Sequence, residues 1–197
     1  MAQGASRPTL VDADEAPPAR RNRVNLFELA YQRLDELLRE FPPEIFTLAE
    51  TLEILDLSGN ELMALPEDLP RLHRLRIVFC SDNPFTELPA VLGRCPSLEM
   101  IGFKANRIEH VPAESLPPTL RWLVLTDNRI EQLPSSIGQC PRLQKLMLAG
   151  NRLRALPPEL AACRNLELLR LSATAGLAQL NGPGASGPRS ARRPSCT

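Results

Sequence analysis

Apolar and polar positions along this chain repeat with a period of 22 or 23 residues. In the phrase LRWLVLTDNRIEQLP, from Leu120 to Pro134, apolar residues occupy positions one, four, six, eleven and fourteen, and an asparagine occupies position nine. This asparagine recurs in phase along the chain, at Asn60, Asn83, Asn106, Asn128 and Asn151. A fixed period of this length indicates a repeat architecture, in which each unit can bury its apolar face only against its neighbours.

The repeated phrase, L-x-x-L-x-L-x-x-N-x-L closed by Leu-Pro, resembles the leucine-rich repeat. The resemblance covers residues 52–174, as five full copies and one partial copy. It implies an α/β solenoid, a curved right-handed stack of parallel strands with short helical or 3-10 turns on the convex side. The apolar alternation at positions four and six predicts a strand over positions three to six of each copy. In this family the asparagine amide pairs with buried backbone groups at the turn, so we expect the five asparagines to form a structural ladder.

The segments before the repeats differ from them in composition. Residues 1–23 are rich in Pro, Ala, Arg and acidic residues and contain few large apolar side chains, which predicts disorder. From Val24 to Phe41, apolar residues recur at three- and four-residue steps, which predicts a helix. We therefore expect residues 24–51 to form an N-terminal cap built on this capping helix, with a degenerate first repeat as the alternative.

The sixth copy begins with Leu166, Leu169 and Leu171 but has Thr174 where the asparagine belongs. Residues 175–197 are rich in Gly, Pro, Ser and Arg, which predicts disorder. A solenoid normally ends in a repeat with a polar outer face. Because no such repeat follows here, we expect the natural architecture to be cut short, and a homodimer through the uncapped strand edge is an alternative to a monomer.

Charge and cysteine usage narrow the classes of function. The 23 basic and 23 acidic residues balance, so no global field recruits nucleic acid or an anionic membrane. The chain has no run of 18 apolar residues and no apolar segment near its start, so neither a membrane span nor a secretory signal is predicted. Four cysteines stand where other copies have core Leu, which predicts small buried residues and not metal ligands or disulfides: Cys80, Cys95, Cys140 and Cys163. Free cysteines of this kind favour a reducing compartment, and we expect a cytoplasmic protein.

Nothing in the sequence predicts an enzyme, a metal site or a cofactor site. The two histidines, His73 and His110, lie in different repeats, and neither is near a nucleophile motif. Phrases such as LDLSGN and LQKLMLAGN resemble the repeat region of bacterial leucine-rich repeat protein kinases, but the chain contains no kinase motifs. The resemblance therefore implies a recognition module. The alternatives to a scaffold or adaptor are the ligand-sensing region of such a kinase and a secreted bacterial leucine-rich repeat effector.

Positions three and five of each copy are expected to face the concave side, where solenoids bind their partners. These positions are mostly apolar in this chain. Exposed apolar surface that contains Trp and Met is typical of protein interfaces, although the same residues also favour sheet formation. We therefore predict a non-catalytic module that binds a protein partner of unknown identity. The predicted partner-binding residues are Ile54, Ile77, Phe79, Met100, Trp122, Val124, Met147 and Arg170.

Overall fold

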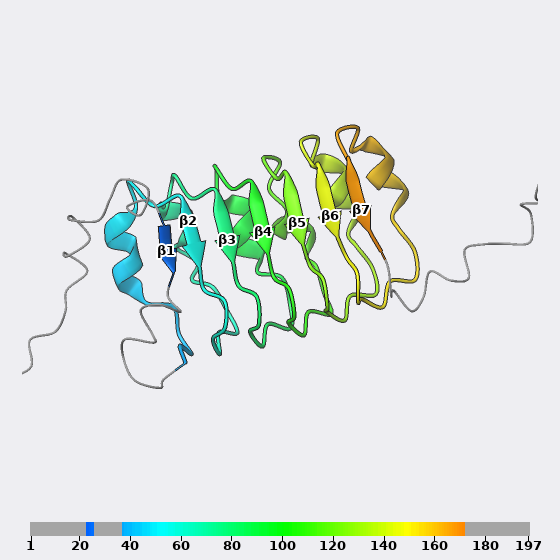
Figure 1. Cartoon of the computed structure of the whole chain (residues 1–197). Coiled ribbons are helices and arrows are strands. Elements are labelled where there is room, and N and C mark those ends of the chain that lie inside the picture. The colour runs from blue at the N-terminus through cyan, green and yellow to red at the C-terminus, as the bar shows by residue number, and fades with distance from the viewer. Residues whose placement is uncertain (1–22, 26–36, 172–197) are drawn as a thin grey trace, which may run out of the picture.

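The strands that the structure describes form one parallel sheet. A computed structural model of the chain describes residues 23–25 and 37–171. Within these residues, seven strands of three residues each follow one another in the order of the sequence (Figure 1). The strands are β1 (Arg23–Asn25), β2 (Ile54–Asp56), β3 (Ile77–Phe79), β4 (Met100–Gly102), β5 (Trp122–Val124), β6 (Lys145–Met147) and β7 (Leu168–Arg170). Because each strand pairs only with its neighbours in sequence, the sheet is the open stack of repeats that the sequence predicts.

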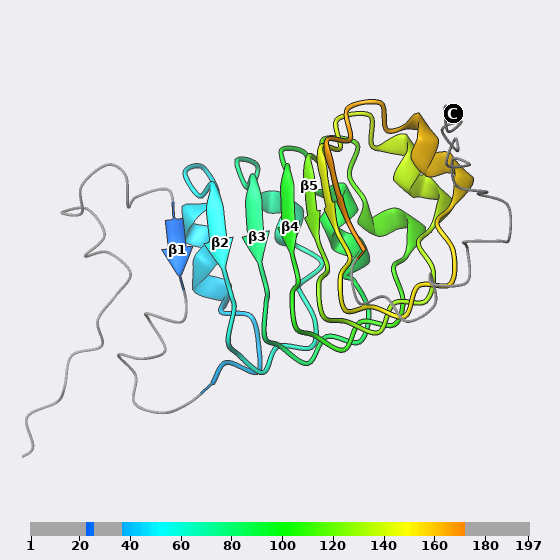
Figure 2. The same ribbon diagram turned by 45° about the vertical axis from the view of Figure 1, so that its right-hand side comes forward.

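Short 3-10 helices return the chain on the other side of the sheet (Figures 1 and 2). They are η2 (Pro43–Leu48), η3 (Leu69–Arg71), η4 (Ala90–Arg94), η5 (Ala113–Ser115), η6 (Ser135–Gln139) and η7 (Pro158–Ala162). Five of these six have a proline as the N-cap residue, with φ between −59° and −69°. A proline has no N–H that could be left unpaired at a helix start, and its φ is already fixed. A proline that follows an apolar residue therefore marks where five of the six returns begin.

Equivalent positions of successive repeats lie side by side in the sheet. Ile54 pairs in register with Ile77, and Met100 with Trp122. The four cysteines at core positions are buried, as predicted, with at most 5% of their surface exposed. Leu169, at the centre of β7, is 37% exposed, since no described strand follows β7. The central residues of β2 to β6 are fully buried: Leu55, Val78, Ile101, Leu123 and Leu146.

The five ladder asparagines are buried and link each turn to the preceding one. The Nδ2 of Asn106 donates to the carbonyl of Cys80 in the preceding repeat at 2.9 Å and to that of Lys104 at 3.1 Å. Its Oδ1 accepts a hydrogen bond from the backbone N–H of Phe85 at 3.2 Å. The other four accept a backbone N–H of the preceding turn in the same way: Asn60, Asn83, Asn128 and Asn151. Each side chain thus satisfies backbone groups of two neighbouring repeats.

The segment before the repeats adds a strand to the sheet at residues 23–25. Arg23–Asn25 form β1, which pairs in parallel with β2, and residues 37–41 contain no helix, so the predicted capping helix is wrong at both of its ends. Its centre, residues 26–36, lies outside the described residues. The Leu38 N–H donates to Asn60 Oδ1 at 3.0 Å, the same contact that links the later repeats. The alternative of a degenerate first repeat agrees with this geometry, because the β2 edge and the Asn60 amide offer backbone partners that a helix would leave unused.

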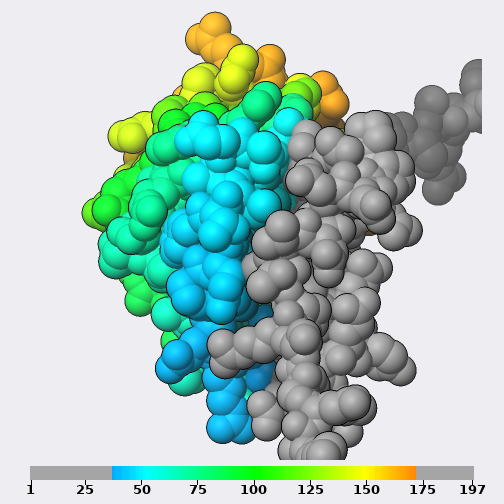
Figure 3. All heavy atoms as spheres, turned by 90° about the vertical axis from the view of Figure 1, so that its left-hand side faces the viewer, coloured from blue at the N-terminus to red at the C-terminus, as the bar shows by residue number. Residues whose placement is uncertain are grey.

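Figure 3 shows the stack from this N-terminal end. Arg23, which the composition placed in a disordered segment, is part of β1. The rest of the segments predicted to be disordered lies outside the described residues, in residues 1–22 and 172–197. The same is true of Thr174.

Candidate protein-binding face

The strand face of the sheet lies opposite the 3-10 helices (Figure 2). It has a row of half-buried apolar side chains. Seven residues form this row, which is the strand stripe: Ile54, Ile77, Phe79, Met100, Trp122, Val124 and Met147. The register of β2 to β6 places each of them beside the equivalent residue of the next strand. Arg170, the remaining predicted binding residue, is exposed and pairs in register with Met147 at the C-terminal end of the stripe. The structure therefore brings all eight predicted binding residues together on one face.

The two aromatic rings of the strand stripe lie against neighbouring strands. A Cβ placed on Gly102 would lie 2.7 Å from Cδ1 of Phe79, so the Phe79 ring covers Gly102, which is buried. The Nζ of Lys145 lies 3.8 Å from the centroid of the Trp122 ring, a cation–π contact between β6 and β5. Both contacts hold the rings in place before any partner binds, which reduces the conformational entropy that binding would remove.

A row of alternating charges borders the stripe at position two, where each strand begins. Arg76 donates to the Glu99 carboxylate at 2.9 Å and lies 4.0 Å from that of Glu53. Arg121 lies 3.9 Å from Glu99, so the alternating charges pair across neighbouring strands. The hydrogen bond to Glu99 and the Glu99 charge raise the pKa of Arg76. This row gives the apolar stripe a polar rim on one side.

The other rim lies where the strands end. Ser58, Ser81, Lys104 and Thr126 occupy position seven there, and all have exposed or half-exposed side chains. The next residue of each repeat has a left-handed backbone, with φ between 54° and 75°: Gly59, Asp82, Ala105, Asp127 and Gly150. Gly, and to a lesser degree Asp, tolerates this region, whereas an alanine there is strained.

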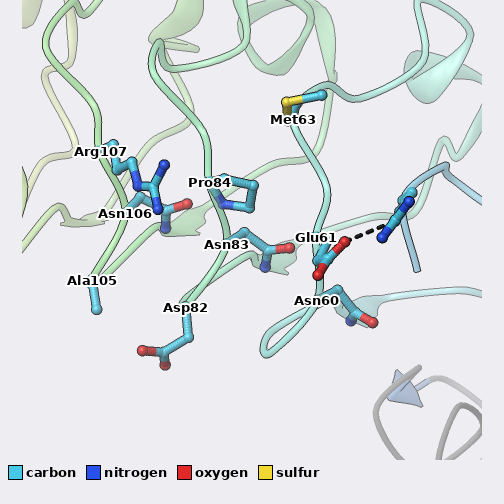
Figure 4. Close-up of a pocket in the computed structure, with 10 residues that line it drawn as sticks. Asn60, Glu61, Met63, Asp82, Asn83, Pro84, Ala105, Asn106 and Arg107 are labelled. Carbon is cyan, nitrogen blue, oxygen red and sulfur yellow. Dashed lines mark hydrogen bonds and ion pairs between the residues drawn. The ribbon is translucent and has the colours of Figure 1, made fainter. Parts of the chain in front are cut away.

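The turns that follow β2, β3 and β4 line an open depression of about 620 Å³, which the sequence did not predict (Figure 4). Its charged and apolar lining residues are Arg39, Glu61, Met63, Asp82, Pro84, Ala105 and Arg107. Met63 is 72% exposed. A comparison of equivalent turn positions between repeats could have pointed to this depression, because Met63 and Pro84 stand where most copies have charged residues.

The described residues offer little for chemistry at neutral pH. His73 and His110 are exposed, and no three described His, Cys, Asp or Glu side chains are grouped so that they could hold a metal ion. Burial raises the pKa of Cys95 to about 12 and that of Cys140 to about 11, so neither thiol supplies a reactive thiolate near pH 7. None of the described helices has the length and apolar character needed to cross a bilayer.

Comparison with known proteins finds leucine-rich repeat proteins. Two family models, both described as leucine-rich repeat, match residues 51–72 and residues 118–175. The chain is 30% identical over 105 residues to the PH domain leucine-rich repeat-containing protein phosphatase 1 of Mus musculus. That match covers 53% of this chain and only 6% of the phosphatase, so the similarity concerns the repeats and not the whole protein.

Solved structures show the same similarity. A leucine-rich repeat protein of Leptospira interrogans is 29% identical, with a TM-score of 0.53, over 69% of this chain and 41% of that one. A plant peptide hormone receptor, solved in complex with RGF2, is 33% identical, with a TM-score of 0.59, over 68% of this chain and 22% of the receptor. The stacked strands and their exposed face define a repeat module of a protein-interaction class. Its repeats are leucine-rich repeats, and the fold is a leucine-rich repeat solenoid.

Proposed function

We propose that this chain is a non-catalytic scaffold or adaptor module that binds a protein partner on its strand face. The strand stripe is the observation that supports this function most directly. Its seven apolar side chains come from five adjacent strands, stand in register and are only half buried. Contiguous exposed apolar surface usually marks an interaction site, and Trp and Met are enriched in such sites.

The size of the stripe indicates how a partner would use it. Five strands about 4.8 Å apart make it about 20 Å long, and two residues along a strand make it about 7 Å wide. That area, about 150 Å², is far below the roughly 800 Å² that each partner buries in a standard interface. A partner must therefore also contact the rims, the charge row at position two and the polar residues at position seven. An apolar centre inside a polar rim is the usual anatomy of a protein interface.

The cellular setting is part of the proposal. We place the module in the cytoplasm, and the four buried cysteines, which a reducing compartment would keep as thiols, support this location. The ligand-sensing region of a kinase and an exported effector would use the same strand face. They differ from a scaffold in what is joined to the repeats and not in the residues that contact the partner.

The test compares two double variants of the intact chain as bait in a pull-down from the source cell. Trp122→Ala with Met147→Ala truncates the stripe, and Gln139→Ala with Glu159→Ala changes two exposed residues on the 3-10 helix side. We expect the stripe variant to recover its specific partner at least about tenfold less well than wild type, because buried aromatic anchors dominate interfaces. The control variant should recover the partner normally. Equal recovery by both variants, with native circular dichroism spectra, would refute the proposed function.

The single tryptophan gives a second readout on a purified complex. Because Trp122 lies in the stripe, its fluorescence should change when the partner binds to the wild-type chain. An unchanged emission spectrum at saturation would place the partner elsewhere.

A further inference from the structure

Positions ten and twelve of the repeats form two surface rows along the turns after the strands. In most repeats these positions are charged, and ion pairs join neighbouring repeats across them. Each pair is exposed to solvent, so the rows face water and are not required by the core. The pairs are Arg39–Glu61 at 2.8 Å, Glu109–Arg129 at 3.5 Å and Glu131–Arg154 at 2.8 Å.

Two neighbouring repeats interrupt both rows at the same place. Met63 occupies position twelve after β2, and Pro84 occupies position ten after β3. Met63 is 72% exposed, more than any other large apolar side chain of the described residues. Because the equivalent positions tolerate charged residues elsewhere in the same fold, packing does not require an apolar residue here. The two residues line one depression, in which Figure 4 shows both.

Two charged side chains beside this apolar pair have no ion-pair partner within the described part of the chain. Arg129, at position ten of its repeat, pairs with Glu109 at position twelve of the preceding repeat. Arg107 occupies the same position ten after β4, but the preceding repeat has Thr86 at position twelve, which cannot form an ion pair. Asp82, after β3, is exposed, and its backbone is left-handed. Arg107 and Asp82 line the same depression of about 620 Å³ (Figure 4). The depression therefore combines an apolar surface with one uncommitted cation and one uncommitted anion.

We propose that Met63, Asp82, Pro84 and Arg107 form a second binding site, on the turns and apart from the strand stripe, for a peptide segment that presents an apolar side chain next to an acidic one. The apolar side chain lies against Met63 and Pro84. The acidic side chain accepts charge-assisted hydrogen bonds from the Arg107 guanidinium. Asp82 repels a second carboxylate, so the site discriminates between an acidic segment and a mixed one.

The methionines of the chain allow this site to be observed separately from the strand face. The chain contains four, at Met1, Met63, Met100 and Met147. In protein labelled with [methyl-¹³C]methionine, the Met63 methyl signal reports on the depression, and the signals of Met100 and Met147 report on the stripe. A Met63→Leu variant identifies the Met63 signal by its loss.

The probe is an acetylated, amidated hexapeptide, Gly-Ser-Leu-Glu-Ser-Gly, titrated into the full chain. One control peptide has Lys in place of Glu, and another has Ser in place of Leu. We expect the probe to shift the Met63 signal along a saturating curve, and both control peptides to shift it much less. Arg107→Gln should weaken binding of the probe by up to about fivefold, the upper end of the range for an exposed ion pair. Arg129→Gln, which changes the same position in the next repeat, should leave the curve unchanged.

Several results would overturn the proposed site. The Met63 signal could stay fixed, the three peptides could shift it equally, or Arg107→Gln could bind the probe as wild type does. A probe that shifts Met100 and Met147 instead would also refute this site while supporting the strand face as a peptide-binding surface. Conversely, a Met63 response in the Trp122→Ala, Met147→Ala variant would support this site whether or not the strand face binds a partner.

Discussion

Asn106→Leu removes one step of the asparagine ladder while keeping a side chain of similar size. The wild-type amide donates to the carbonyls of Cys80 and Lys104 and accepts from the N–H of Phe85. Leucine can make none of these bonds. The contacts with Phe85 N–H and the Cys80 carbonyl are buried, whereas that with the Lys104 carbonyl is only partly buried. Two orphaned buried groups cost about 1–3 kcal/mol each.

The new leucine offsets part of this loss. Asn106 is 9% exposed, so a leucine there would bury most of its side chain, which contributes about 1.5–3 kcal/mol at most. We therefore expect the free energy of unfolding to fall by about 2 kcal/mol, because about 4 kcal/mol for the two orphaned groups is offset by about 2 kcal/mol from the added burial. Urea unfolding followed by far-UV circular dichroism measures this difference.

Asn165→Leu is the matched control. Asn165 is exposed, and its Nδ2 donates to the carbonyl of Pro141 at 2.7 Å, so its replacement should change stability by no more than about 0.5 kcal/mol. Hydrogen exchange adds a local readout. In Asn106→Leu the Phe85 amide should exchange faster, while the Leu62 amide, which donates to Asn83, should keep its protection. If both leucine variants lose the same stability and Phe85 stays protected, the ladder does not stabilise the fold as argued.

Three further predictions concern other parts of the scaffold. Ala105→Gly relieves a left-handed backbone that costs alanine about 1–2 kcal/mol. The greater freedom of glycine in the unfolded chain offsets about 0.4–1 kcal/mol of this, so urea unfolding should show a gain in stability of about 0.5–1 kcal/mol. A loss of stability would contradict the strain at this residue. Glu99→Gln breaks exposed pairs with Arg76 and Arg121 and should lower stability by at most about 1 kcal/mol at low salt, with no difference left in 1 M NaCl. Burial raises the pKa of Cys95 from 9.0 to about 12, so this thiol stabilises the fold below pH 9 and its contribution is lost as pH rises toward 12. Cys95→Leu should therefore lose less stability than wild type between pH 8 and about pH 10.5.

The repeat phase predicts most of the fold, because strict spacing fixes which side chains point inward. Leu123 and Trp122 are adjacent in sequence, yet the first is fully buried and the second half exposed, as their positions in the repeat require. The N-terminal strand was not predictable in the same way. The apolar steps from Val24 to Phe41 satisfy a helix when taken alone, whereas β1 depends on the edge of β2, a partner distant in sequence.

The candidate site is also only partly predictable from the sequence. Positions three and five place the strand stripe, but the orientation of its rings depends on contacts between strands, such as Phe79 with Gly102. The depression on the turns depends on the path of three consecutive turns, each with a left-handed residue, at Gly59, Asp82 and Ala105. No local pattern in one repeat encodes that path, so only a comparison between repeats reveals its unusual residues.

Such comparison gives this fold an internal control, because each repeat offers nearly the same environment at each position. The centre of β2 to β6 accepts only Leu, Val or Ile, which is the variation that full burial allows. Turn positions ten and twelve accept residues of either charge, because they are exposed to solvent. Met63 and Pro84 follow neither pattern, since they are apolar residues at these exposed positions. If one partner contacts both surfaces, the methyl signals of Met63 and Met147 should respond at the same partner concentration. If the two sites bind different segments, the signals should respond independently, and Arg107→Gln should alter only the Met63 response.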